Sequence, residues 1–127
     1  MSHSAKIADG IKDLASELSP DHKRIIAAGG MDDGELGTDA IKIMDAIKTA
    51  DEGDGVVILA DIGSGIMSAE MAIELLEEEA ETIDARIADA PIVEGTVAAV
   101  VTASLGRPIE EVMAAAEETW STRKIVR

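Results

Sequence analysis

Apolar positions recur at helical spacing in the first part of the chain. They fall at intervals of four, three and four residues, at Ile7, Ile11, Leu14 and Leu18. This spacing places them on one face of a helix. Ser4 is a suitable N-cap for it, and Ser19-Pro20 is expected to end it.

Four further helices are predicted along the chain. The second follows Thr38 as its cap, with Ile41, Met44 and Ile47 in helical register. The third carries Met67, Met71 and Leu75, and its methionines are expected to fill the core. The last two are expected at about 95–104 and 109–122, with Trp120 packing the final helix onto the sheet.

Short apolar runs between the helices predict strands. Residues 25–28 precede two glycines and are interpreted as a buried strand. Residues 55–60 give the strongest strand pattern, because they are continuously apolar, as in a parallel strand covered on both faces. Residues 85–90 form a weaker candidate that Pro91 stops, and 92–93 are expected to add a short edge strand.

Strands that alternate with helices predict an α/β fold with an open, mostly parallel sheet and helices on both faces. Residues 1–127 are expected to form a single domain. In such sheets the ligand site lies beyond the carboxyl ends of the strands, at the point where the strand order reverses. The first helix has no strand before it, so the repeat begins at a turn.

Composition and charge narrow the classes of function. The chain of 127 residues is 46% hydrophobic but has no Phe, Tyr or Cys, so its core is aliphatic and it has no disulfide or thiolate metal site. A net charge of −15 repels phosphate backbones and anionic lipids, which argues against nucleic-acid and membrane partners. Two explanations of the charge stay open, a basic protein partner and a cytoplasm of very high salt.

The apolar runs of the chain are too short to span a bilayer, and no signal-peptide core precedes Lys6. A cytoplasmic protein is therefore expected.

Three segments with groups that can bind an oxyanion lie in loops that lead into helices. They are Ser2-His3-Ser4, residues 34–39 and residues 61–65. Each offers small or hydroxyl residues with backbone N–H groups near a helix N-terminus. Such groups suit a phosphoryl ligand.

His3 is the natural nucleophile of this set, and Asp61 is the natural acceptor to hold its other ring nitrogen. The alternatives are an exposed His3 without a role and an Asp61 that caps a turn. His22 lies in a polar loop and is expected to have no role. No metal and no cofactor are expected, because phosphoryl transfer needs mainly positioning and charge stabilisation and the two His have no metal-ligand spacing.

Five motifs in order resemble a known family. They are Ser2-His3-Ser4, Gly37-Thr38-Asp39, Asp61-Ile62-Gly63-Ser64, Ser68-Ala69-Glu70 and Pro91-Ile92-Val93-Glu94-Gly95. Together they resemble the DhaM family, the phosphotransferase subunits of PTS-dependent dihydroxyacetone kinases. Its core domain is similar to the mannose-class IIA domains of the sugar phosphotransferase system. The resemblance runs from residue 2 to about 118.

The resemblance implies a phosphohistidine carrier. Phosphoenolpyruvate would phosphorylate enzyme I, then HPr, then His3, and the phosphoryl group would pass to ADP held by DhaL and so serve DhaK. Asp61 would orient the imidazole, while Gly37, Thr38, Gly63 and Ser64 would bind the phosphoryl group. A homodimer is expected. Two alternatives stay open: a IIA domain of a mannose-class sugar transporter, and a regulatory module that keeps the fold without the chemistry.

Two departures from the family pattern give further expectations. Some relatives carry HPr-like and enzyme I-like domains after this one, whereas this sequence ends at Arg127, so separate donor proteins are expected. The family also has an apolar first strand before its Ser-His-Ser motif, where this sequence has only Met1. We therefore expect the natural start of the protein to lie upstream.

Overall fold

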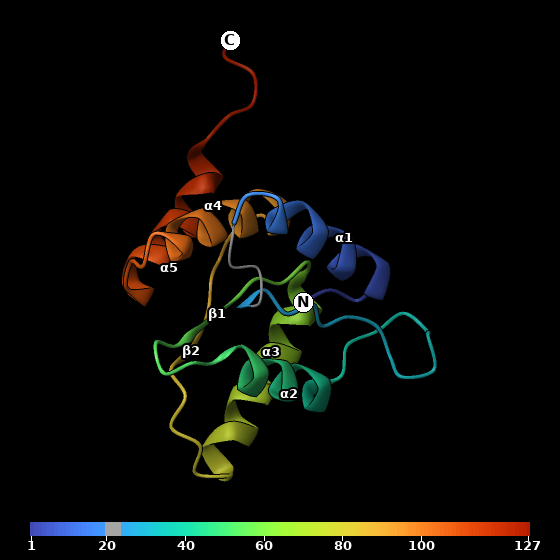
Figure 1. Ribbon diagram of the computed structural model, residues 1–127. Helices are drawn as coiled ribbons and strands as arrows, with labels where there is room; N and C mark the ends of the chain where they lie inside the picture. The colour runs from blue at the N-terminus through green and yellow to red at the C-terminus, as the bar shows by residue number, and fades with distance from the viewer. Residues whose placement is uncertain (20–23) are drawn as a thin grey trace.

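The computed structural model describes residues 1–19 and 24–127. Its elements follow one another as helices and short strands (Figure 1). In chain order they are α1 Ala5–Ser16, α2 Ala40–Ala50, β1 Val56–Ile58, α3 Gly63–Glu78, β2 Ala85–Ile87, α4 Ile92–Ser104, α5 Ile109–Glu118 and the 3₁₀ turn η2 Thr119–Ser121. Among the described residues, no helix combines the length and the apolar character that a bilayer crossing requires.

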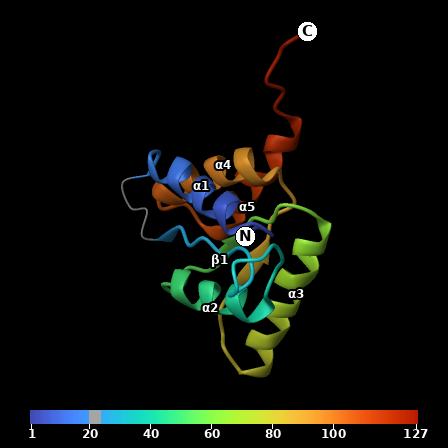
Figure 2. The ribbon, with the colours of Figure 1, turned by 90° about the vertical axis from the view of Figure 1, so that its right-hand side faces the viewer.

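The strands lie in a layer between two groups of helices. Helices α1, α4 and α5 lie on one side of it, and α2 and α3 lie on the other (Figures 1 and 2). The two strands are parallel, with Val57 opposite Arg86. These features confirm the predicted α/β class with a parallel sheet and helices on both faces.

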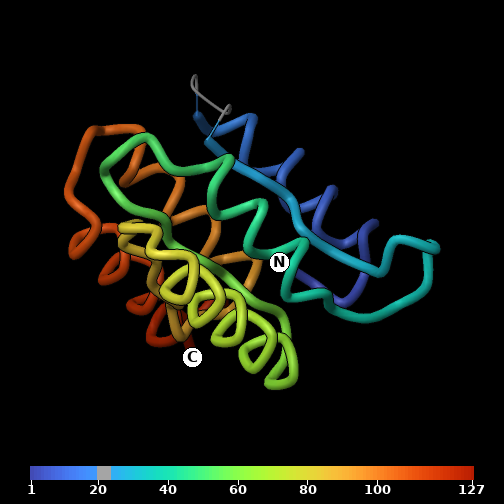
Figure 3. The backbone as a smooth tube through the Cα atoms, turned by 90° about the horizontal axis from the view of Figure 1, so that it is seen from below, coloured from blue at the N-terminus to red at the C-terminus, as the bar shows by residue number. Residues whose placement is uncertain are grey.

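Two extended segments continue the layer beyond β1. Ser2 forms a parallel bridge with Gly29, and the Met1 nitrogen donates a hydrogen bond to the Leu59 carbonyl at 2.5 Å. The order across the layer is therefore residues 25–29, residues 1–2, β1 and β2. Figure 3 shows residues 24–30 passing alongside α1 and α2. A Cβ atom at Gly29 would lie 3.0 Å from the Ala8 Cβ of α1, and the Gly29 carbonyl accepts a hydrogen bond from Lys42 of α2.

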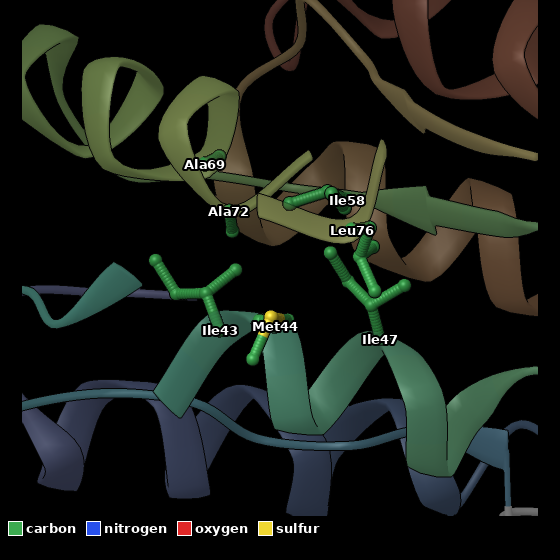
Figure 4. Packing of buried hydrophobic residues seen from close by; sticks show 7 residues of the cluster. All are labelled: Ile43, Met44, Ile47, Ile58, Ala69, Ala72 and Leu76. Carbon is green, nitrogen blue, oxygen red and sulfur yellow. The ribbon is translucent and has the colours of Figure 1, made fainter. Parts of the chain in front are cut away.

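The core consists of two aliphatic clusters, one on each face of the layer. The first joins α2 and α3 to β1 through Ile43, Met44, Ile47, Ile58, Ala69, Ala72 and Leu76 (Figure 4). The second joins Leu59 and the residues after β2 to α4 and α5, and it contains Leu59, Ala88, Ala90, Ala99, Val112 and Ala116. Small alanines let the helices approach the strands closely, so the chain packs without Phe or Tyr.

Several predicted element boundaries are wrong. Residues 25–28 form no strand, because within the described ranges 1–19 and 24–127 the pairing next to them is limited to the single bridge of Ser2 with Gly29. Residues 92–93 are the first turn of α4 and not an edge strand, since Gly95 N–H already donates to the Pro91 carbonyl as in a helix. The strands predicted over 55–60 and 85–90 are confirmed only as Val56–Ile58 and Ala85–Ile87.

The predicted N-cap is confirmed for α1 and is wrong for α2. Ser4 caps α1 as expected, because its hydroxyl accepts from the Ile7 N–H. Asp39, not Thr38, caps α2, since its carboxylate accepts from the N–H groups of Ile41 and Lys42. Helix α1 ends at Ser16, earlier than expected, and the predicted loop residues Pro20 and His22 lie outside the described part of the chain.

The buried faces of two helices also differ from the prediction. Helix α3 turns its small residues and Leu76 inward, so Met67 and Met71 are 70% and 56% exposed and do not fill the core. In α1 the buried residues are Ala8 and Ala15, whereas Ile7 is half exposed. In both helices the alanines face the rest of the protein and allow close packing, whereas the large apolar side chains lie at the edge of the buried face.

Trp120 was expected to pack the last helix onto the sheet, and this is wrong. The side chain is 63% exposed, and its indole N–H donates to the Asp89 carboxylate. Its polar N–H thus finds a partner at the surface, where an amphipathic ring is commonly found.

Candidate functional site

The candidate site lies where two neighbouring segments of the strand layer end. His3 follows the extended residues Met1 and Ser2, and Asp61 follows the segment that continues β1. Because these segments are parallel neighbours, their carboxyl ends meet at one edge of the layer. The chain leaves them toward opposite faces, into α1 and α3, which makes this edge the switch point of the fold.

The His3 imidazole is held by Asp61. His3 Nδ1 lies 2.9 Å from Oδ1 and 3.0 Å from Oδ2 of the carboxylate. An ionised carboxylate only accepts hydrogen bonds, so the ring proton is on Nδ1 and the lone pair is on Nε2. The His3 side chain is 25% exposed, which leaves this ring accessible from solvent.

Asp61 accepts hydrogen bonds from four donors, of which the ring nitrogen of His3 is one. They are the Ser2 hydroxyl, the His3 backbone N–H, the Ile62 backbone N–H and His3 Nδ1–H. Burial by itself raises the pKa of this carboxyl. The bonds from His3, Ile62 and Ser2 outweigh it and lower the pKa from 3.8 to about 2. Asp61 is therefore fully ionised at neutral pH.

Ser2 and Ser4 fix the backbone on either side of His3. The fully buried Ser2 hydroxyl donates to Asp61 and accepts from the Ser4 N–H at 3.1 Å. Ser4 in turn caps α1. Sequence reasoning gave Ser2 no role, although a small hydroxyl residue beside a candidate nucleophile is a signal for such a bond.

The loop before α2 supports the site from a second side. The Gly37 N–H donates to the His3 carbonyl at 2.9 Å, and the Thr38 hydroxyl lies 2.5 Å from the Ser68 hydroxyl of α3. These bonds join the loop to His3 and to α3. Ser68 was missed as a site residue, although it lies one helical turn after Ser64 and thus on the same face of α3.

The N-terminus of α3 faces His3 Nε2, the ring nitrogen that Asp61 does not contact. The Ser64 hydroxyl lies 2.7 Å from His3 Nε2, where it donates to the lone pair. No side chain caps this helix, and Gly63 has open space around it. The first N–H groups of a helix have no partner within it, and the helix dipole favours negative charge there. Neither in this site nor in the rest of the described chain do three or more His, Cys, Asp or Glu side chains form a cluster able to hold a metal ion.

Gly65 is a site residue that sequence reasoning did not single out. A Cβ atom at this position would lie 2.9 Å from Asp61 Oδ1 and 3.5 Å from His3 Cε1. The first distance is shorter than real Cβ contacts allow, and the carboxylate cannot move away without loosening His3. The absence of a side chain at residue 65 thus lets α3 approach the pair.

Substitution of this glycine is expected to impair the site more than the fold. Gly65→Ala should slow the phosphoryl acceptance that the sequence resemblance implies for His3 by about tenfold or more, since a misplaced reacting group is costly. Gly63→Ala is the matched control, because a Cβ there meets nothing within 4 Å. The measurement is the rate of phosphorylation by the donor that the resemblance implies, phospho-HPr, at equal folded concentration. Equal rates for the two variants would refute the assigned close approach.

The predicted site residues thus fall into two groups. His3, Asp61 and Ser64 are brought into direct contact, and Gly63 lies beside them at the start of α3. Gly37 contacts the His3 backbone, and Thr38 contacts α3 through Ser68. All of them come from the three loops that the sequence had grouped.

Comparisons with known proteins show which family the chain belongs to. The model of the family EIIA-man, described as "PTS system fructose IIA component", matches residues 1–113. A relative from Listeria innocua, the phosphoryl donor subunit DhaM of PEP-dependent dihydroxyacetone kinase 2, is 44% identical over 111 residues, with 87% of each chain covered. DhaM of Escherichia coli is 41% identical over 116 residues, which cover 89% of this chain and 24% of that protein.

The share of each relative that is covered differs. The chain spans about a quarter of the length of the Escherichia coli and Klebsiella michiganensis relatives, but most of the Listeria innocua protein. A solved structure described as "Crystal structure of unknown function protein EF1359" has a TM-score of 0.79 and 38% identity, covering 92% of this chain and 89% of that one. With its fold, its match over residues 1–113 and its relatives named DhaM, the chain belongs to the EIIA-man family of PTS IIA components.

Proposed function

We propose that the chain is a phosphohistidine carrier of a PTS-dependent dihydroxyacetone kinase. His3 accepts a phosphoryl group from phospho-HPr, which enzyme I has charged from phosphoenolpyruvate, and passes it to ADP held by DhaL. The ATP formed there serves DhaK. The observation that carries this proposal is the pairing of His3 Nδ1 with Asp61, which directs Nε2 toward Ser64 at the exposed start of α3. Relatives named DhaM support the choice of kinase.

The first transfer needs no proton movement at the attacking atom. The Nε2 lone pair forms a bond to phosphorus while the N–P bond of the donor breaks and its electron pair returns to the donor's imidazole. His3 keeps its proton on Nδ1, so the ring gains positive charge, and the ionised Asp61 stabilises that charge at 2.9 Å. The return step to ADP reverses these bonds.

The start of α3 supplies the groups that stabilise the transferred oxygens. The Ser64 hydroxyl moves its donated bond from Nε2 to a phosphoryl oxygen, and the Gly63 and Ser64 N–H groups add their dipoles. The Gly37 N–H bonds to the His3 carbonyl, and the Thr38 hydroxyl bonds to Ser68. These bonds fix the loop before α2 beside the ring, where it forms a second wall of the phosphoryl pocket. No metal or cofactor takes part in this scheme.

Both protein partners must reach the same nitrogen, so they use one surface in turn. Exposed apolar side chains lie on the segments that carry the site: Leu36 before Gly37, Ile62 after Asp61, and Met67 in the second turn of α3. Such side chains suit docking of a protein partner. The proposed place of action is the cytoplasm, where HPr and enzyme I act, and the proposed assembly is a homodimer.

The acceptor distinguishes this function from service to a sugar transporter. The chain, phosphorylated by enzyme I and HPr and then freed of both, should lose its phosphoryl group to ADP-loaded DhaL and produce ATP stoichiometrically. DhaL without ADP should leave the phosphohistidine intact. ATP formation is measured by a coupled luminescence assay. Transfer to the IIB protein of a mannose-class transporter, with none to DhaL, would reverse the assignment.

A further inference from the structure

Trp120 is the largest side chain of a sequence without Phe or Tyr, and it lies at the surface. It belongs to the turn η2, which follows α5 directly. Its indole N–H donates to the Asp89 carboxylate at 3.3 Å, and this bond holds the ring in place. Tryptophan is among the residues that most often anchor a protein partner at an interface.

The bond to Asp89 places this ring at the same edge of the strand layer as His3. The Ala88 N–H donates to the Ile58 carbonyl, so Asp89 follows β2 beside the residues that lead to Asp61. His3, Asp61 and Asp89 thus end three neighbouring segments of the layer. Two strand spacings, about 10 Å, separate the backbone of Asp89 from that of His3. Figure 2 shows η2 and the start of α3 on the same side of the molecule.

Two further exposed apolar side chains lie along this edge. Ile62 directly follows Asp61, and Val93 lies in the first turn of α4, which begins soon after β2. Together with Trp120 they are called here the Trp120 surface. It begins beside the reacting ring and extends toward α4 and η2.

The rim of the Trp120 surface is acidic. Glu117 accepts a hydrogen bond from the Asp89 N–H at 3.0 Å, beside the Asp89 carboxylate that holds the indole. Glu94 of α4 pairs with Lys124 at 2.5 Å. Three carboxylates and one ammonium group are therefore bonded around the ring. Such a rim attracts a partner whose own surface is basic.

A protein that exchanges a phosphoryl group with His3 has to cover this region. An interface of standard size buries about 800 Å² on each partner, and a round patch of that area has a radius of about 16 Å. This radius exceeds the distance of about 10 Å between the backbones of His3 and Asp89. A protein docked over His3 therefore extends over Trp120 as well.

The charge of the rim distinguishes between the two partners of the proposed function. The acceptor brings the phosphates of ADP, and carboxylates near the site repel these phosphates. The donor brings only the phosphoryl group that is transferred. The Trp120 surface therefore suits the donor protein better than the acceptor.

We propose that Ile62, Val93 and Trp120 form the docking surface of the phosphoryl donor protein, with the Trp120 ring as its anchor. The matching surface of the donor is apolar at its centre and carries lysine or arginine around it. This proposal rests on the proposed function, because it names the surface from which the donor reaches His3.

Trp120→Ala tests the anchor. Initial rates at increasing phospho-HPr should show KM raised at least about tenfold, since anchoring tryptophans carry much of the binding energy of an interface. The maximal rate should change less than about twofold, because the ring touches no reacting atom. Leu105→Ala is the matched control: this side chain is 73% exposed, against 63% for Trp120, and it lies at the opposite end of α4 from Val93. Its KM should equal that of the native chain.

Phosphoramidate separates the possible failures, because this small N–P donor needs no docking surface. It should phosphorylate the native chain and Trp120→Ala at equal rates. An unchanged KM for phospho-HPr in Trp120→Ala, or equal increases in Trp120→Ala and Leu105→Ala, would overturn the proposal. So would dissociation of the chain's own assembly by Trp120→Ala at an unchanged KM, which would assign the surface to a second copy. A native chain that reacts with phosphoramidate but not with phospho-HPr would refute the proposed function itself.

A charge variant tests the acidic rim separately. Glu94→Gln should raise KM for phospho-HPr about two- to threefold at low salt, and the difference should disappear at high salt, because rim charges steer association. Glu79→Gln is the matched control, since Glu79 also pairs with a lysine, Lys48, but at the far end of α3. An equal effect of the two variants on KM would refute steering by this rim.

Discussion

His3→Ala is expected to abolish phosphoryl acceptance from phospho-HPr. The variant lacks the imidazole that Asp61 holds with Nε2 directed toward the start of α3, and the described residues include no second histidine that could replace this nucleophile. Acceptance is measured as the gain of one acid-labile phosphoryl group in the intact-protein mass.

The loss should occur without unfolding. In the variant, Asp61 keeps its bonds from Ser2, from the residue 3 backbone N–H and from Ile62, so a destabilisation of about 1 kcal/mol is expected. His22→Ala is the matched control and should retain full acceptance. Equal losses in the two variants would show that the nucleophile has been misassigned.

Asp61→Asn is expected to slow transfer by about 100- to 10,000-fold. An amide can turn its NH₂ group toward Nδ1, which would place the ring proton on Nε2 and remove the attacking lone pair. The same change in a serine-protease triad costs about 10⁴ for the wrong tautomer. The amide also cannot stabilise the positive charge that the ring gains. The readout is the single-turnover rate per folded molecule.

The same variant is expected to change the acid stability of the fold. Asp61 has a lower pKa in the folded protein, about 2 against 3.8, so its contribution is present above about pH 4 and is lost as pH falls toward 2. The shift corresponds to at most about 2 kcal/mol. The native chain should therefore lose stability between pH 4 and 2 more steeply than Asp61→Asn. A variant with a large fall in melting temperature but an unchanged rate would mean that Asp61 is structural only.

The contact of His3 with Asp61 could be predicted from sequence because both residues lie at the ends of elements. His3 precedes a helix with a recognisable cap, and Asp61 ends the strongest apolar run, so the fold class alone brings them to one edge. The contacts of Ser2, Gly65 and Ser68 could not be predicted in the same way. They depend on how closely α3 approaches residues 1–3, and that distance is set by tertiary packing.

The errors in the fold have a common physical origin. Hydrophobicity suggested Met67 and Met71 for the core, but the small surfaces of Ala69 and Ala72 let α3 lie closer to α2 and β1. Residues 25–28 have a strand's composition, yet a strand also needs a paired neighbour, and in the described part of the chain their one backbone bond to a neighbouring segment is from Ser2 to Ala28. Composition indicates what a segment can form, whereas its neighbours decide whether it does.

The identity of the phosphorylated nitrogen tests the central claim most directly. The chain, with its histidines labelled with ¹⁵N, is phosphorylated by phosphoenolpyruvate, enzyme I and HPr and observed by NMR through the nitrogen–phosphorus coupling. The geometry predicts a single phosphohistidine, at Nε2 of His3, with Nδ1 still protonated and bonded to Asp61. Phosphorylation at Nδ1, or at a residue other than His3, would contradict the account.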